Sequence, residues 1–215
     1  MPRKKSVSHE RIVEAAKREF ERYGFKEASM RNIAMEAGMS ASGLYKHFPS
    51  KEEMFASLVE PVKTEFERMY RERERREYAE FGNGSAEIIA EQVGGTRWAM
   101  EFIYEHLQEF RLLTIKSGGT MYENYIHDMA KIEETATLMY ISELRKKGKN
   151  TIDLPRSEVH LLVTAQVNAV FEAVKHGFTK EEALHYADTL DNFFMPGWLS
   201  VMGVSAAGHQ KGASA

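Results

Sequence analysis

Apolar residues recur along most of this chain at intervals of three and four, which is the spacing of one face of an α-helix. Three short segments of this kind follow one another before residue 50. Gly24, Gly38 and Pro49 are placed to end them. Serines suited to cap the three segments stand before each one, at Ser8, Ser29 and Ser40. No alternating β-branched run is long enough for a strand, so the pattern predicts an all-α protein.

The remaining chain contains further helix boundaries. Three capping boxes, in which a hydroxyl residue is followed three positions later by glutamate, predict helix starts at Ser50–Glu53, Thr120–Glu123 and Thr179–Glu182. Pro155 suits the start of another helix, Gly177 suits its end, and a helical region is expected to divide near His106. Together these boundaries predict about nine helices, of which the fourth is long.

Charge is distributed unevenly. Residues 1–51 carry 11 Lys and Arg against 6 Glu, whereas the rest carries 18 basic and 26 acidic residues, and the whole chain has a net charge of −3. A basic segment on an acidic body is expected when one part of a protein meets a polyphosphate. Chance scatter is the alternative explanation for this asymmetry.

Several classes of function lack their sequence motifs. The chain contains no cysteine, no phosphate-binding glycine loop, no nucleophile elbow and no His-Glu-x-x-His, so an enzyme is not expected. Its histidines are scattered, which argues against a metal site, and no cofactor is expected. Without a leader or a long apolar run, the expected location is cytoplasmic, away from any membrane.

Residues 29–48 contain the most informative pattern, two short helical segments joined by Ala37-Gly38-Met39-Ser40. A junction of this size is typical of a helix-turn-helix, whose second helix enters the DNA major groove. In that second helix Leu44 and Phe48 can face the core. The residues then left outside are Ser42, Gly43, Tyr45, Lys46 and His47. They suit contacts with phosphates or base edges; the alternative is that Tyr45 and His47 pack sideways against the fourth helix.

Residues 9 to about 58 resemble the tetracycline-repressor (TetR) family. The resemblance rests on Arg11-Ile12-Val13-Glu14-Ala15-Ala16, Tyr23-Gly24-Phe25, Met30-Arg31-Asn32-Ile33-Ala34, Ala37-Gly38-Met39-Ser40, Gly43-Leu44-Tyr45-Lys46-His47-Phe48 and Ser50-Lys51-Glu52. It is specific because aromatic, glycine and lysine positions all agree in spacing over this span.

The resemblance implies roles for individual residues. Tyr45 and His47 would contact phosphates or bases, Ser40 and Ser42 would lie where the recognition helix begins, Lys51 would bind phosphate beside the fourth helix, and Arg31 would reach a base or phosphate. The basic residues of segment 1–7 look like a flexible arm for a minor groove, with a solubilising terminus as the alternative.

The resemblance also implies a domain organisation. Residues 1–58 would bind double-stranded DNA, and 59–203 would form a helical effector-binding and dimerisation domain. The small and polar composition of residues 204–215 separately predicts a disordered tail. Helices at about 156–176 and 179–202 are apolar over a broad arc, which favours a homodimer through these helices. A monomer that buries them in its own core is the alternative.

Aromatic and methionine side chains in the second domain could surround a small-molecule effector. They are Trp98, Phe102, Phe110, Tyr122, Tyr125, Met129 and Phe171. Ordinary core packing explains such a set equally well. The expected function is a dimeric repressor that binds a palindromic operator and is released by an effector. The alternatives are an architectural or activating DNA-binding dimer without an effector, and a helical enzyme or interaction module.

Overall fold

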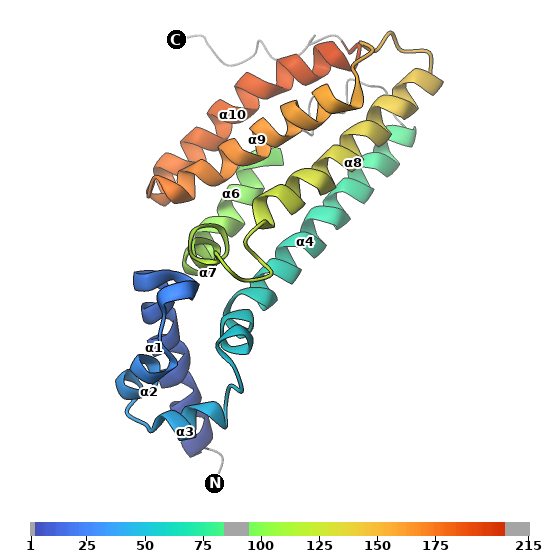
Figure 1. Cartoon of the computed structure of the whole chain (residues 1–215). Helices are drawn as coiled ribbons and strands as arrows, with labels where there is room; N and C mark the ends of the chain where they lie inside the picture. The colour runs from blue at the N-terminus through green and yellow to red at the C-terminus, as the bar shows by residue number, and fades with distance from the viewer. Residues whose placement is uncertain (1–2, 84–94, 205–215) are drawn as a thin grey trace. The chain divides into compact units, whose positions relative to one another are not determined.

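The computed structural model describes residues 3–83 and 95–204 of the chain, and the side chains of residues 9–76 and 95–204 (Figure 1). Within these residues it contains nine α-helices, one short π-helix and no strand, which confirms the all-α prediction. The chain forms two compact units. The first unit comprises Met1–Phe66 and His106–Tyr125, and the second comprises Glu67–Glu105 and Ile126–Ala215.

The first unit begins with three helices and the start of a fourth, longer helix. These are α1 (Arg3–Glu27), α2 (Met30–Glu36), α3 (Ala41–Tyr45) and α4 (Lys51–Asn83). The apolar face predicted for α1 is fully buried, with Ile12, Ala15, Ala16 and Phe20 all inaccessible to solvent. The helix begins at Arg3 and not at Ser8, because no residue between them breaks a helix. The segment from Arg3 to residue 7, predicted as a flexible arm, is therefore helical.

A second stretch of chain completes the first unit. It contains α7 (Leu107–Arg111) and the π-helix η1 (Leu112–Lys116), and it packs against α1. Lys17 Nζ lies 2.6 Å from Glu109 Oε1, and Arg111 Nε lies 2.5 Å from Glu21 Oε1. Phe110 is fully buried with its ring edge against Phe66. The compact unit thus extends beyond residue 58, where the sequence predicts its end, and includes 106–125.

The second unit contains the second part of α4 and four further helices. These are α6 (Gly95–Glu105), α8 (Tyr125–Lys146), α9 (Arg156–Lys175) and α10 (Lys180–Val201). Helix α10 packs on α6 and beside α9 (Figure 1). The predicted division at His106 is confirmed, as α6 ends at Glu105 and α7 begins at Leu107. The capping box at Thr179 is also confirmed, with both of its reciprocal hydrogen bonds present.

Two predicted boundaries are wrong, namely the start of one helix and the start of the C-terminal tail. Helix α8 begins at Tyr125 and not at Thr120, because the Glu123 carboxylate accepts a hydrogen bond from the Gly119 amide and residues 117–124 form turns. Val204, predicted to lie in the disordered tail, is buried against Leu144 and Leu199. The predicted tail from residue 205 onward lies outside the described residues.

Candidate nucleic-acid interface

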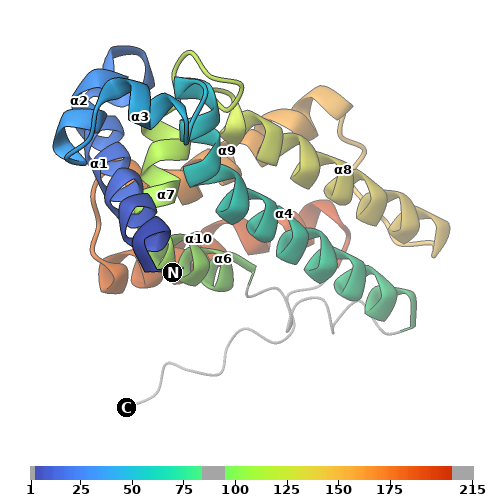
Figure 2. The same ribbon diagram turned by 90° about the horizontal axis from the view of Figure 1, so that it is seen from below.

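The junction between α2 and α3 has the geometry of a tight helix-turn-helix. Gly38 adopts a positive φ of 71°, and the Met39 amide donates to the Ala34 carbonyl at 2.9 Å, which ends α2 as predicted. Ser40 then caps α3, since its Oγ accepts a hydrogen bond from the Gly43 amide at 3.1 Å. Figure 2 shows α2 and α3 lying side by side after this turn.

The residues of and after α3 divide between core and surface as the spacing predicts. Leu44 and Phe48 are buried, whereas Ser42, Tyr45, Lys46 and His47 are exposed. Helix α3 itself is only five residues long, so Lys46 is its C-cap and His47 lies in the turn that follows. The exposed side chains present a phenol, an ammonium and an imidazole, all of which can donate hydrogen bonds to phosphate oxygens.

Gly43 leaves the backbone of α3 accessible. A Cβ added at this position would meet only the Ser40 Oγ, at 3.2 Å, and nothing else within 4 Å. An alanine here would therefore press on the cap of the helix and on any group that approaches this face. The Oγ atoms of Ser40 and Ser42 lie 3.2 Å apart beside it, so two hydroxyls border the same strip of backbone.

Helix α2 contributes a second row of exposed side chains. Arg31 and Met35, one turn apart, both line a groove that continues past Gly38 to Ala41. Arg31 and Lys46 form no ion pair among the residues that the structure describes, so both charges can meet phosphate. Sequence reasoning missed Met35, although its spacing of four from Arg31 and its place outside the Ile33, Ala34 core pattern were available signals.

Lys51 is placed differently from the other predicted contacts. Its Nζ donates to the carbonyl oxygens of Lys26 and Ala28, each at 3.0 Å, and lies 4.7 Å from the centre of the Phe25 ring. The ammonium therefore joins the start of α4 to the end of α1. One N–H remains available, so a phosphate contact is compatible with this position.

The residues predicted to surround an effector lie in different parts of the structure. Phe110, Tyr122 and Tyr125 belong to the first unit, where Phe110 packs on Phe66 and Tyr122 on Phe55. Trp98, Phe102, Met129 and Phe171 belong to the second unit. All except Trp98 are buried.

Among the side chains that the structure describes, no group of three or more His, Cys, Asp or Glu is arranged to hold a metal ion. No helix within the described ranges is long and apolar enough to cross a membrane.

Comparison with known proteins places the N-terminal segment in a described family. The family model for bacterial regulatory proteins of the tetR family matches residues 12–58. A curated relative, the uncharacterized HTH-type transcriptional regulator YfiR of Bacillus subtilis (strain 168), is 45% identical over 49 residues. That match covers 23% of this chain and 24% of the relative, so the chain matches about a quarter of the length of that protein.

A solved structure extends the likeness in fold to nearly the whole chain. A TetR-like transcriptional regulator from Rhodococcus sp. RHA1 superposes with a TM-score of 0.55 at 20% sequence identity, covering 92% of this chain and 99% of that one. The sequence match locates the family-defining segment at α1 to the start of α4, and the structural match gives the fold of the remainder. Residues 12–58 of this chain are thus similar to the tetR family of bacterial regulatory proteins, and the chain as a whole has the fold of the Rhodococcus structure.

Proposed function

We propose that this protein is a transcriptional regulator that binds double-stranded DNA through α2, α3 and the turn after α3. The observation that carries the proposal is the exposed set Tyr45, Lys46 and His47, which surrounds the accessible backbone at Gly43. Tyrosine, lysine and histidine at these positions can position the protein on phosphates, while the open glycine backbone permits close approach. Arg31 and Met35 on α2 would meet the same DNA.

The regulator would act as a homodimer and as a repressor released by a small molecule. Exposed leucines on α9 and an exposed phenylalanine on α10 support the dimer. Two copies of α3 spaced about 34 Å apart would enter successive major grooves of a palindromic operator. An effector would lower the DNA affinity by binding more tightly to the conformation that does not fit the operator.

The DNA-binding proposal can be tested without knowledge of the operator. Duplexes are selected from a random pool with the unmodified protein, and the affinity of Tyr45→Ala for the selected pool is then measured. We expect about a tenfold loss, which is the effect of one hydrogen bond to a charged group. Lys46→Ala should lower the slope of log K against log salt by about one unit.

Tyr23→Ala is the matched control, because Tyr23 is 45% exposed and Tyr45 is 49% exposed, both within the first unit. The control should bind the selected pool as the unmodified protein does. Failure of the unmodified protein to enrich any duplex, or an equal loss for both tyrosine variants, would contradict the proposal.

A further inference from the structure

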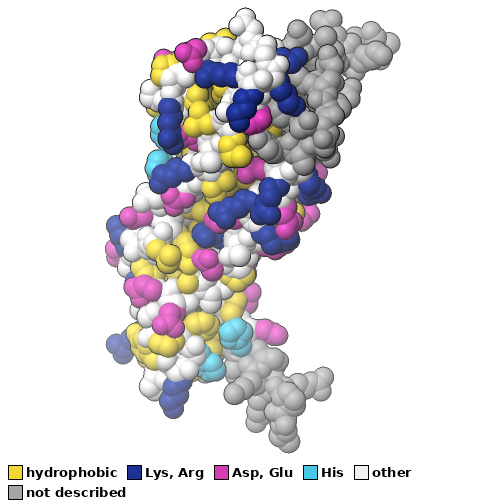
Figure 3. Space-filling view, turned by 90° about the vertical axis from the view of Figure 1, so that its right-hand side faces the viewer, with side chains coloured by type: hydrophobic (Ala, Val, Ile, Leu, Met, Phe, Trp, Pro, Cys, Tyr) yellow, Lys and Arg dark blue, Asp and Glu magenta, His cyan; other side chains and the backbone are white. Residues whose placement is uncertain are grey.

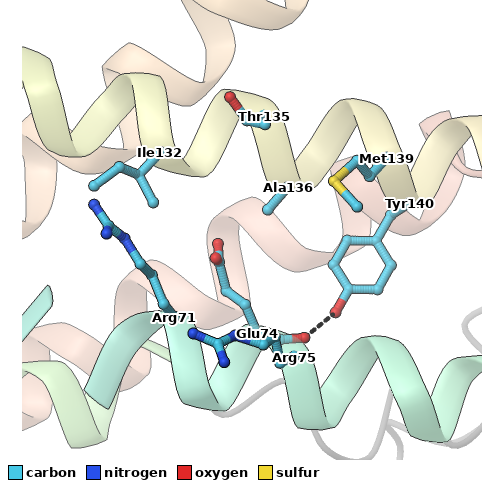
Figure 4. A pocket seen from close by; sticks show the side chains of 8 residues that line it. All are labelled: Arg71, Glu74, Arg75, Ile132, Thr135, Ala136, Met139 and Tyr140. Atoms are coloured by element: carbon cyan, nitrogen blue, oxygen red, sulfur yellow. Dashed lines mark hydrogen bonds between the residues drawn. The ribbon is translucent and has the colours of Figure 1, made fainter. Parts of the chain in front are cut away.

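A cavity of about 390 Å³ lies in the second unit between α4 and α8 (Figure 4). One wall comes from α4 through Arg71, Glu74 and Arg75. The other comes from α8, chiefly through Ile132, Ala136 and Met139. Its volume falls within the range of about 300–1,000 Å³ that is usual for sites that bind a small molecule.

The wall from α4 is basic. Arg71 and Arg75 are one helical turn apart and therefore lie on the same face of α4. The nearest carboxylate to Arg71 is that of Glu67, whose Oε2 is 3.8 Å from Arg71 Nη2 and too far for a hydrogen bond. Arg75 makes no hydrogen bond or ion pair with any residue that the structure describes. Two guanidinium groups in this wall can thus take up an anion with little competition.

The wall from α8 is apolar. Ile132, Ala136 and Met139 follow the spacing i, i+4, i+7, which places them in one row along the helix. Met139 is 49% exposed, so a long apolar side chain faces solvent beside the arginines. In Figure 4 the Arg71 side chain extends from α4 toward Ile132, which brings the basic and apolar groups together.

The remaining polar groups of the cavity limit what it can accept. The Tyr140 hydroxyl donates to the backbone carbonyl of Glu74 at 3.3 Å and joins the two helices at one end. The Glu74 carboxylate lies between the two arginines in the sequence of α4 and reduces the net charge of this wall to one positive charge. Figure 3 shows Lys and Arg side chains intermixed with Asp and Glu side chains on one face of the molecule. This net charge favours a ligand with a single negative group.

We propose that this cavity binds a small amphipathic organic anion, with its acidic group on Arg71 and Arg75 and its apolar chain or ring along Ile132, Ala136 and Met139. Guanidinium groups bind carboxylates and related oxyanions through paired, charge-assisted hydrogen bonds. The assignment of this anion as the effector rests on the function proposed above, whereas its binding does not.

The test uses the full chain without DNA, and octanoate as the probe. Titration is followed by NMR of ¹³C-methyl methionine, and Met139→Leu assigns the Met139 signal. A saturable shift of the Met139 methyl with octanoate is expected. 1-Octanol lacks the charge and inorganic phosphate lacks the apolar chain. Each should bind at least about tenfold more weakly than octanoate.

Arg75→Gln and Arg76→Gln form a matched pair, since both arginines are exposed on α4 and only Arg75 lines the cavity. Arg75→Gln should weaken octanoate binding about tenfold, and Arg76→Gln should leave it unchanged. Absence of a saturable Met139 shift, or an equal effect of the two substitutions, would overturn the proposal. Because the titration contains no DNA, its result does not depend on whether the protein binds DNA.

Discussion

Lys51 shows how one side chain can stabilise the fold of the first unit. Its ammonium donates to two carbonyl oxygens near the end of α1, where the helix dipole is negative. Lys51→Met removes both bonds and should lower the free energy of unfolding by about 2 kcal/mol. Urea denaturation of the DNA-free protein measures this loss.

Lys46→Met is the control for Lys51, because Lys46 is exposed and forms no ion pair among the described residues. It should leave the unfolding midpoint unchanged while it weakens DNA binding. If Lys51→Met also unfolded at the midpoint of the unmodified protein and lost only DNA affinity, the carbonyl contacts would contribute nothing to stability.

Tyr122 and Glu60 form a second long-range pair within the first unit, and their contact sets a pH dependence. Burial opposes ionisation of Glu60, but the hydrogen bond from Tyr122 and the nearby Lys63 outweigh it, so its pKa is lowered. Burial, followed by the bond to Glu60, raises the pKa of Tyr122. Stability should therefore decrease as the pH falls through the range where Glu60 titrates, because the unfolded chain takes up the proton first.

At alkaline pH, ionisation of Tyr122 determines how stability changes with pH. The folded state keeps the Tyr122 proton above pH 10, where an unfolded tyrosine loses it, so stability should fall as the pH rises further. Tyr122→Phe should flatten both limbs of the curve of unfolding midpoint against pH. Tyr23→Phe, at an exposed tyrosine, should leave them in place, and an identical curve for Tyr122→Phe would disprove the coupling.

The end of α10 offers a prediction at the scale of a helix. Gly203 has a φ of 67°, and a Cβ there would lie 2.4 Å from the Asn150 carbonyl oxygen. Gly203→Ala should therefore destabilise the protein by about 2 kcal/mol or more, through backbone strain and a clash with main chain. Gly197→Ala, inside α10 and with nothing within 4 Å of the added Cβ, should instead stabilise it by about 0.5–1 kcal/mol.

Thermal or urea denaturation of the two glycine variants measures these changes in stability. Equal effects of the two alanines would mean that neither the positive φ nor the Asn150 carbonyl constrains the end of α10. A gain in stability at Gly203 would contradict the geometry of this helix end directly.

Elements whose boundaries depend on neighbouring residues were predictable from the sequence. The Gly38 turn, the Ser40 cap and the Thr179 capping box each involve groups within five residues of one another. The predicted start at Thr120 failed because Tyr122, two residues later, is buried against Phe55, which lies far away in the sequence. Tertiary packing there outweighs a local capping signal worth about 1 kcal/mol.

In the candidate site, too, the features set by neighbouring residues were predictable and those set by distant segments were not. The exposure of Tyr45, Lys46 and His47 follows from helical spacing alone, once Leu44 and Phe48 are assigned to the core. The carbonyl partners of Lys51 and the cavity between α4 and α8 depend on pairs of segments distant in sequence. No local pattern of charge or hydrophobicity specifies such pairs.

At the scale of the whole molecule, the two compact units do not correspond to continuous halves of the chain. Residues 106–125 belong with the first unit because Phe110 packs on Phe66 and because Glu109 and Arg111 pair with Lys17 and Glu21 of α1. Because the chain leaves and re-enters the first unit, a change in 106–125 acts on α1 through these contacts.

Dimerisation is the prediction that concerns the molecule as a whole. Leu161 on α9 is 65% exposed and Phe193 on α10 is 73% exposed, although burial of such side chains is favourable. Multi-angle light scattering should give about twice the chain mass of 24.6 kDa for the unmodified protein. Leu161→Arg with Phe193→Arg should give a single chain mass, because two arginines per subunit would be buried without partners. Met121→Arg, at a residue 84% exposed outside α9 and α10, should remain dimeric. A mass of one chain for the unmodified protein would refute the dimer.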